Sequence, residues 1–157
     1  MGYTTEFSGF FKLDKPLDKN TRKILHGLNN TRRMKRDLTK LGMSVEEAAN
    51  YGIDGEFYFP PKTNFMGQDN DDSIIDHNSP PTTQPGLWCG WRYSKRQNSI
   101  KWDGGEKFYY YVEWLDYIID FILKPNYVLN GKVTFRGEDE NDHGTIIIKN
   151  NKIMVKY

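Results

Sequence analysis

The sequence predicts an α+β domain in which a mainly antiparallel sheet packs against one N-terminal helix and one long helix in the C-terminal half. Three observations predict this class. Runs of aromatic and β-branched residues bounded by turn residues occur near both ends of the chain, as is typical of strands. Two other segments place apolar residues at helical spacing. A stretch rich in Pro, Asp and Asn at 60–86 predicts a long irregular loop, and 157 residues fit a single domain spanning 1–157.

The N-terminal part of the chain predicts a strand followed by a helix. Aromatic residues alternate loosely through 3–13, and Pro16 bounds this first strand. Asp18 or Thr21 can cap the helix that follows, because both side chains accept a hydrogen bond from a free backbone N–H. The spacing predicts that this helix continues to position 38. The residues on its main line are Ile24, Leu28, Thr31, Lys35 and Leu38.

The middle of the chain carries a second helix signal before the long loop. Ser44 and Glu47 form a capping box, which predicts a short helix that ends at Gly52. Residues 56–59 follow as a candidate strand. The loop at 60–86 then contains few apolar residues, and a loop of this length in a compact domain is usually functional or mobile.

The second half of the chain predicts a hairpin, a helix and three strands. The hairpin strands lie at 87–93 and 100–103 and carry three of the four tryptophans. The helix at 106–123 stops before Pro125, since proline cannot continue a helix. Three short strands complete the sheet, at 131–136, 145–149 and 152–157. The Asn-Asn pair at 150–151 predicts a tight turn between the last two strands.

The predicted helix at 106–123 has two apolar faces. One stripe suits packing on the sheet and consists of Phe108, Val112, Leu115, Ile119 and Ile122. The opposite stripe is aromatic and consists of Tyr110, Trp114, Tyr117 and Phe121. Two interpretations of this aromatic stripe are open. Either the long loop or the first helix covers it within the domain, or it binds a protein partner or a second copy of the chain, since Trp and Tyr are favoured at interfaces.

Basic residues concentrate in the first 40 positions, which hold ten Lys and Arg against four acidic residues, although the whole chain has a net charge of +1. One stripe of the predicted first helix is polar and consists of Arg22, Asn29, Arg33, Arg36 and Lys40. This basic face is a candidate for binding phosphates or an acidic partner. The candidate nucleic-acid-binding residues are Arg32, Arg33, Arg36 and Lys40. The alternative is a solvated face, or one paired with the acidic residues between the two stripes of the long helix.

Two short motifs suggest a possible enzymatic site. The segments His77-Asn78-Ser79 and His143-Gly144-Thr145 are similar to the paired motifs of two-histidine phosphoesterases. That resemblance implies that His77 and His143 act as acid or base beside the hydroxyls of Ser79 and Thr145. Both motifs lie next to turn residues here, whereas the family places them within strands.

Other kinds of site are not indicated. Cys89 lies within an aromatic run and is expected to be a small buried residue rather than a nucleophile. Asp103 and Glu106 are expected to cap the long helix, which disfavours phosphate binding at the glycines between them. The acidic loops lack the pattern of a calcium loop, so no metal or cofactor is predicted. The chain shows neither a secretion signal nor a membrane-spanning apolar run, so we expect a cytoplasmic protein without membrane contact.

Four segments resemble a family of small uncharacterised bacterial and phage proteins. These segments are TRRM at 31–34, QPGLWCGW at 84–91, WDGGEKFY at 102–109 and GED at 137–139. The resemblance spans most of the chain and implies a cytosolic α+β domain with an accessory role, and the abundance of Asn, Lys, Ile and Tyr suits a phage-encoded protein. It carries no site residue over to this chain.

These observations predict a non-catalytic protein-binding or inhibitory accessory protein, which acts through the aromatic stripe, the loop at 60–86, or both. One alternative is a phosphoesterase or nucleotide-binding enzyme that uses His77 and His143. The other is a nucleic-acid-binding accessory protein that uses the basic first helix.

Overall fold

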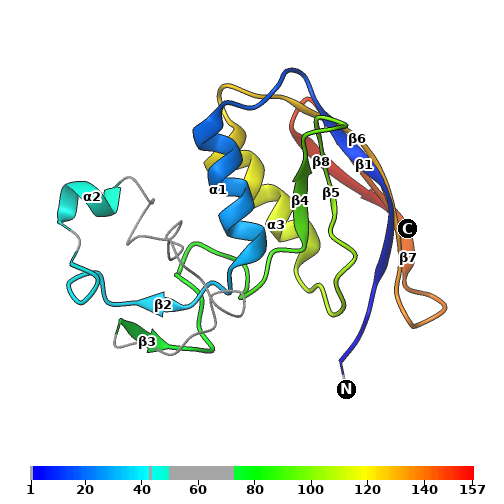
Figure 1. The fold of residues 1–157 in the computed structure, drawn as a ribbon. Coiled ribbons are helices and arrows are strands. Elements are labelled where there is room, and N and C mark those ends of the chain that lie inside the picture. Colours follow the sequence, from blue (N-terminus) through cyan, green and yellow to red (C-terminus); the bar gives the residue numbers. More distant parts are fainter. Residues whose placement is uncertain (1, 43, 50–72) are drawn as a thin grey trace.

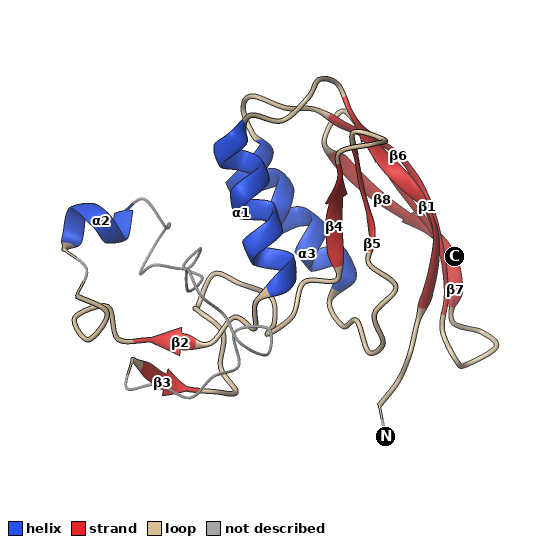
Figure 2. Cartoon of the chain, in the orientation of Figure 1, coloured by secondary structure: helices blue, strands red, loops and turns tan. Residues whose placement is uncertain are grey.

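The computed structural model describes residues 2–42, 44–49 and 73–157 and confirms the α+β class. In chain order the elements are β1 (Glu6–Leu13), α1 (Lys19–Asn30), β2 (Lys35–Arg36), α2 (Val45–Ala49), β3 (Ile74–Asp76), β4 (Trp91–Ser94), β5 (Ser99–Trp102), α3 (Tyr111–Tyr117), the π-helix η3 (Ile118–Leu123), β6 (Leu129–Arg136), β7 (His143–Lys149) and β8 (Lys152–Lys156). Six strands form one antiparallel sheet in the order β4-β5-β1-β6-β7-β8, and β2 pairs with β3 separately. Figures 1 and 2 show α1 and α3 beside each other on the same side of the large sheet.

The predicted first strand is confirmed as β1, which lies in the sheet between β5 and β6. Two glycines allow β1 and β6 to approach closely. Gly9 has a φ of 106°, and a Cβ there would lie 2.6 Å from the backbone oxygen of Lys132. Gly131 has a φ of 149°, and its Cβ would lie 2.7 Å from the backbone oxygen of Phe10. Both positions therefore require glycine.

Helix α1 begins as predicted and ends earlier. The Asp18 carboxylate caps it by accepting a hydrogen bond from the Thr21 N–H at 2.8 Å. The prediction that the helix continues to position 38 is wrong, because the chain is extended from Thr31 onward. The N–H groups of Arg33 and Lys35 donate to backbone oxygens of other segments, at 2.8 Å each, instead of to the preceding helical turn. Tertiary contacts therefore end this helix.

The Asp18 cap gives a testable pH dependence. The Tyr127 hydroxyl donates to the Asp18 carboxylate at 2.6 Å and, together with the Thr21 N–H, lowers the pKa of Asp18 from 3.8 to about 2. The lowered pKa means that the stabilisation is present above about pH 4 and is lost as the pH falls through about 2. We expect Asp18→Ala to lower the free energy of unfolding at pH 7 by about 1 kcal/mol, measured by urea denaturation, and the difference from wild type to shrink as the pH falls from 4 through 2.

Asp18→Asn is the matched control, because asparagine also caps helices but does not titrate. It should keep most of the stability at pH 7 and lose the pH dependence between pH 4 and 2. An unchanged pH dependence in both variants would mean that other carboxyl groups cause it.

The second predicted helix is confirmed as α2, where the Ser44 hydroxyl accepts a hydrogen bond from the Glu47 N–H at 3.1 Å. Its predicted end at Gly52 and the predicted strand at 56–59 lie outside the described residues. The described end of the predicted loop contains a short strand, β3, which the sequence does not predict. This strand pairs with β2, with Lys35 opposite Asp76.

The predicted hairpin is confirmed as β4 and β5, although β4 begins at Trp91 rather than at position 87. Trp91 is buried at the centre of an aromatic cluster, and its indole N–H donates to the backbone oxygen of Tyr111 at 2.8 Å. Phe7 lies in the same cluster, with its ring centroid 5.0 to 5.7 Å from those of Trp91, Trp102, Phe108 and Tyr111. This cluster joins β1, the hairpin and the approach to α3 in one core.

The long helix begins at Tyr111 instead of 106, so the prediction that Asp103 and Glu106 cap it is wrong. Tyr110 has a left-handed backbone with a φ of 58°, which stops the helix from extending toward the N-terminus. From Ile118 the helix widens into the π-helix η3, and the Lys124 N–H donates to the oxygen of Ile119. The wider turn places Ile118, Ile119 and Leu123 in the core and shifts the faces that a regular α-helix would present.

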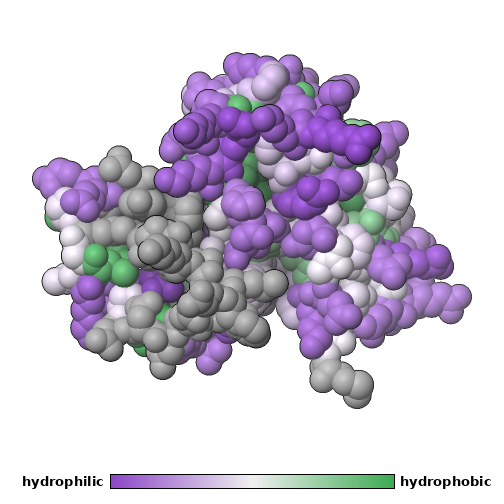
Figure 3. Space-filling view, in the orientation of Figure 1, coloured by the Kyte–Doolittle hydropathy of each residue, from purple (hydrophilic) through white to green (hydrophobic). Residues whose placement is uncertain are grey.

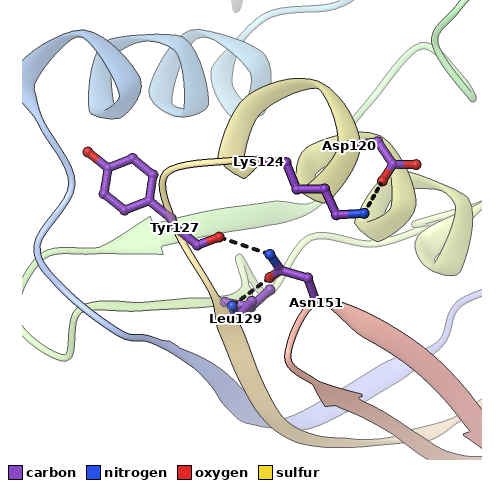
Figure 4. Close-up of polar contacts among 5 residues, drawn as sticks. All are labelled: Asp120, Lys124, Tyr127, Leu129 and Asn151. Atoms are coloured by element: carbon purple, nitrogen blue, oxygen red, sulfur yellow. Dashed lines mark hydrogen bonds and ion pairs between the residues drawn. The ribbon is translucent and has the colours of Figure 1, made fainter.

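The three C-terminal strands are confirmed as β6, β7 and β8. Asn150 and Asn151 form the predicted tight turn, with φ values of 50° and 66°. Figure 4 shows how Asn151 holds this turn against the start of β6. Its side chain accepts from the Leu129 N–H at 2.6 Å and donates to the backbone oxygen of Tyr127 at 2.9 Å. The same view shows the ion pair of Asp120 and Lys124, at 3.1 Å, at the end of η3.

Candidate functional site

The candidate site is a groove of about 730 Å³ between the segment that precedes β4 and the segment that precedes α3. We call it the aromatic groove. Its size lies within the range of ligand-binding pockets. Among the described residues, those that define its walls are Trp88, Phe108, Tyr109, Tyr110, Pro80 and Pro85. The two segments with the distinctive tryptophan and Gly-Gly sequences therefore meet at one surface.

Hydrogen bonds hold the two segments in a fixed arrangement. The Asp103 N–H donates to the backbone oxygen of Gly90 at 2.9 Å. The Asn29 amide, at the end of α1, donates to the backbone oxygen of Cys89 at 3.0 Å and to the Asp103 carboxylate at 2.9 Å. A Cβ on Gly90 would lie 2.5 Å from the Phe108 ring, so this ring packs directly on the glycine backbone. The base of the groove is thus formed before any partner arrives.

Two residues that line the groove have an unfavourable backbone conformation. Lys107 and Tyr110 each have a φ of 58°. The other described residues with positive φ are glycines or asparagines, which tolerate it better. Strained backbone of this kind is often concentrated at functional sites. Here it turns the chain between β5 and α3 so that Tyr109 and Tyr110 are 47% and 58% exposed.

The other wall of the groove is formed by Trp88, which is partly buried. The Arg32 guanidinium lies over its ring, 6.0 Å from the centroid. Arg32 also donates to the backbone oxygen of His77 at 3.1 Å and to the side-chain oxygen of Asn78 at 3.2 Å. Arg32 therefore ties the segment after β3 to the tryptophan wall.

The structure divides the predicted aromatic stripe into a buried centre and exposed ends. Trp114 is 0% exposed and Tyr117 is 3% exposed. The end of the long loop covers them, because the Gln84 amide donates to the Tyr117 hydroxyl at 3.3 Å and Gly86 lies against Trp114 and Tyr110. Phe121 stacks on Tyr117 at 5.0 Å with its outer side 49% exposed. The loop therefore covers the centre of the aromatic stripe, as the first of the two interpretations predicts.

The predicted basic residues do not lie on a helical face, since α1 ends before them. Arg33 is 3% exposed, and its backbone N–H donates to the oxygen of Leu87. Arg36 lies in β2 and donates to the Ser73 hydroxyl at 2.8 Å. Lys40 is exposed in the turn that follows β2. This corrects the predicted basic stripe, whose spacing assumed a continuous helix.

The structure does not bring His77 and His143 together. His77 follows β3 and His143 begins β7, and Figure 1 shows these two strands on opposite sides of the molecule. The Ser79 hydroxyl donates to the Asp76 carboxylate at 2.8 Å, and this turn lowers the pKa of Asp76, chiefly through the Asn78 N–H. Thr145 lies within β7, opposite Thr134 of β6. The geometry that a two-histidine reaction requires is therefore not formed.

Cys89 is 1% exposed, and burial raises the pKa of its thiol to about 12. It is a core residue, as the sequence predicts. Within the residues that the structure describes, no cluster of three or more metal-ligating side chains occurs. In the same part of the chain, no helix has the length and apolar character needed to span a bilayer.

Comparisons with protein-family models, with curated proteins and with solved structures found no match to this chain.

Sequence reasoning assigned Trp88 to a strand and Tyr109 to a helix, and so did not identify them as walls of one groove. The feature of the sequence that could have identified these walls is the unusual composition of the segments 84–91 and 102–109. The left-handed backbone at Lys107 and Tyr110 could not be predicted, because neither residue type favours that conformation.

Proposed function

We propose that the protein is a non-catalytic binding protein, and that its aromatic groove accepts an extended segment of a partner protein. By binding that segment, the protein would act as an accessory protein or an inhibitor of its partner. The observation that carries the proposal is the groove itself, in which exposed Tyr109 and Tyr110 face the Trp88 wall across a preformed base. Tyr and Trp dominate binding energy at protein interfaces.

The polar residues around the groove support recognition of a peptide backbone. Asp103, Glu106 and Lys107 line the groove and are exposed, and Asn78 and Asn30 also line it. Mixed acidic, basic and amide groups around an apolar centre are typical of a protein-binding surface. Prolines at positions 80 and 85 stiffen the wall formed by the loop, which lowers the entropy lost on binding.

The enzymatic alternative has less support. It needs His77 and His143 on one cleft, and they lie on opposite sides of the molecule. The nucleic-acid alternative based on Arg32, Arg33 and Arg36 also has less support, since Arg32 and Arg36 contact other parts of the chain and Arg33 is buried.

Selection from a random peptide library displayed on phage tests the proposal. We expect the wild-type protein to enrich peptides with an apolar anchor residue. Trp88→Ala and Tyr110→Ala should each weaken the binding of those peptides at least about tenfold, as expected for central interface residues. Isothermal titration calorimetry with synthetic peptides measures this change.

Met154→Ala is the matched control, because Met154 is an exposed apolar residue on β8, away from the groove. It should bind the selected peptides like the wild type. Light scattering in parallel shows whether the groove binds a second copy of the chain. Failure to enrich any peptide, or peptides that bind Trp88→Ala and Tyr110→Ala as well as wild type, would refute the proposal, provided that both variants melt like folded proteins.

A further inference from the structure

A second concave surface, unrelated to the aromatic groove in its chemistry, lies between α1 and β4. One face of α1 is polar along its whole length. Its residues occur at positions i, i+3, i+4, i+7, i+10 and i+11, which places them on one face of the helix. They are Lys19, Arg22, Lys23, His26, Asn29 and Asn30. Leu25 and Leu28 on the other side of the helix are buried, so the polar face is directed away from the core.

Strand β4 supplies the other wall. It is an edge strand of the large sheet, and α1 packs beside it. Tyr93 of β4 and Lys95 of the following turn lie across a space of about 590 Å³ from the polar side of α1. Arg92 lines the edge of this space, and its side chain lies on the opposite face of the strand from Tyr93. We call this space the basic groove. Figure 3 shows hydrophilic side chains over α1 and β4.

The charge of the basic groove is not balanced locally. Five of its lining residues are Lys or Arg, and no lining residue is acidic. In the part of the chain that the structure describes, the side chains of these five residues form no ion pair. The Nε of Arg22 is also buried with no hydrogen-bond partner among the described residues. Like charges gathered in a concave surface attract anions and repel one another until an anion binds.

We propose that the basic groove binds the phosphate groups of a single-stranded nucleic acid. Lys and Arg side chains along both walls would contact successive phosphates. Tyr93 lines the same space with its ring partly exposed, and its hydroxyl donates to Asn98 at 2.9 Å, which fixes the ring. An aromatic ring beside a cationic track is the arrangement on which single-stranded bases stack.

The basic groove shares Arg22 and Asn29 with the polar stripe that the sequence predicts for the first helix. The other predicted basic residues lie at 32–40, where the chain has left the helix. The structure instead combines the full length of α1 with a hairpin about 70 residues away in sequence. The proposal is independent of the aromatic groove and can hold or fail separately.

Fluorescence anisotropy with a labelled single-stranded oligonucleotide tests the proposal on the full chain. Binding should weaken as salt increases, and the slope of log K against log salt should be about −2 to −3, which corresponds to three or four neutralised phosphates. The double variant Lys23→Glu with Lys95→Glu should bind at least about tenfold more weakly than wild type, because both lysines line the groove. Tyr93→Ala should bind more weakly than Tyr93→Phe, which keeps the ring.

The control variant is Lys149→Glu with Lys152→Glu, which changes the net charge equally at the opposite edge of the sheet. It should keep most of the affinity. An equal loss of affinity in both double variants would overturn the proposal and indicate a non-specific charge effect. Undetectable binding of the oligonucleotide at low salt would also overturn it. Displacement of the strand by a nucleoside triphosphate at equal phosphate concentration would also overturn it and indicate a free-nucleotide site. Circular dichroism melting shows that each variant is folded.

Discussion

Replacing Trp91 with alanine is expected to destabilise the fold by roughly 3–5 kcal/mol. Trp91 is 1% exposed and packs against Phe7, Phe11 and Phe108, with centroid distances of 5.3 to 5.7 Å. Its removal leaves a large cavity in the cluster that joins the hairpin to the rest of the core. It also leaves the backbone oxygen of Tyr111 without its indole donor.

Urea denaturation followed by circular dichroism measures this loss. A domain of this size has a total stability of about 5–15 kcal/mol, so Trp91→Ala is expected to lose a large fraction of that stability and to unfold at much lower urea than wild type. Trp91→Phe keeps an aromatic ring but loses the hydrogen bond, and is expected to fall between wild type and alanine. A Trp91→Ala protein with wild-type stability would mean that the aromatic cluster is not the core of the fold.

Replacing Trp114 with alanine is expected to cost a similar amount, roughly 3–5 kcal/mol. This substitution decides between the two interpretations of the aromatic stripe. Trp114 is 0% exposed beneath Gly86, so truncation creates a cavity under the covering loop. Phe121→Ala is the matched control from the same stripe, because Phe121 is 49% exposed. It should change the free energy of unfolding by less than about 1 kcal/mol.

The two variants are compared by urea denaturation and light scattering under the same conditions. We expect Trp114→Ala to unfold at much lower urea while Phe121→Ala unfolds like wild type. A Trp114→Ala protein that stays stable but loses a binding partner would restore the interpretation of the whole stripe as an interface, and would show that the Gln84–Gly86 segment moves aside on binding.

Local patterns predicted the elements whose formation depends on neighbouring residues. The Asp18 cap, the Ser44 capping box and the Asn-Asn turn at 150–151 each appear where the sequence places them. In each case one side chain or one backbone preference acts within a few residues, so no distant contact is needed.

The boundaries that the sequence misplaced depend on distant contacts. The first helix ends at Asn30 because the backbone of Arg33 and Lys35 pairs with Leu87 and Ser79. The long helix begins at Tyr111 because the preceding segment is tied to Gly90 and Asn29. Hydrogen bonds between segments so far apart leave no periodic trace in the sequence.

The sequence by itself determined the α+β class, the places along the chain of the six strands of the large sheet, and the presence of more aromatic residues than a small core requires. Only the tertiary structure decided which aromatic residues are buried and which are exposed. Trp114 and Tyr110 share one predicted stripe, yet a covering loop buries the first and leaves the second at a groove. Burial depends on what packs against a residue, and for both grooves the opposing wall comes from a distant part of the chain.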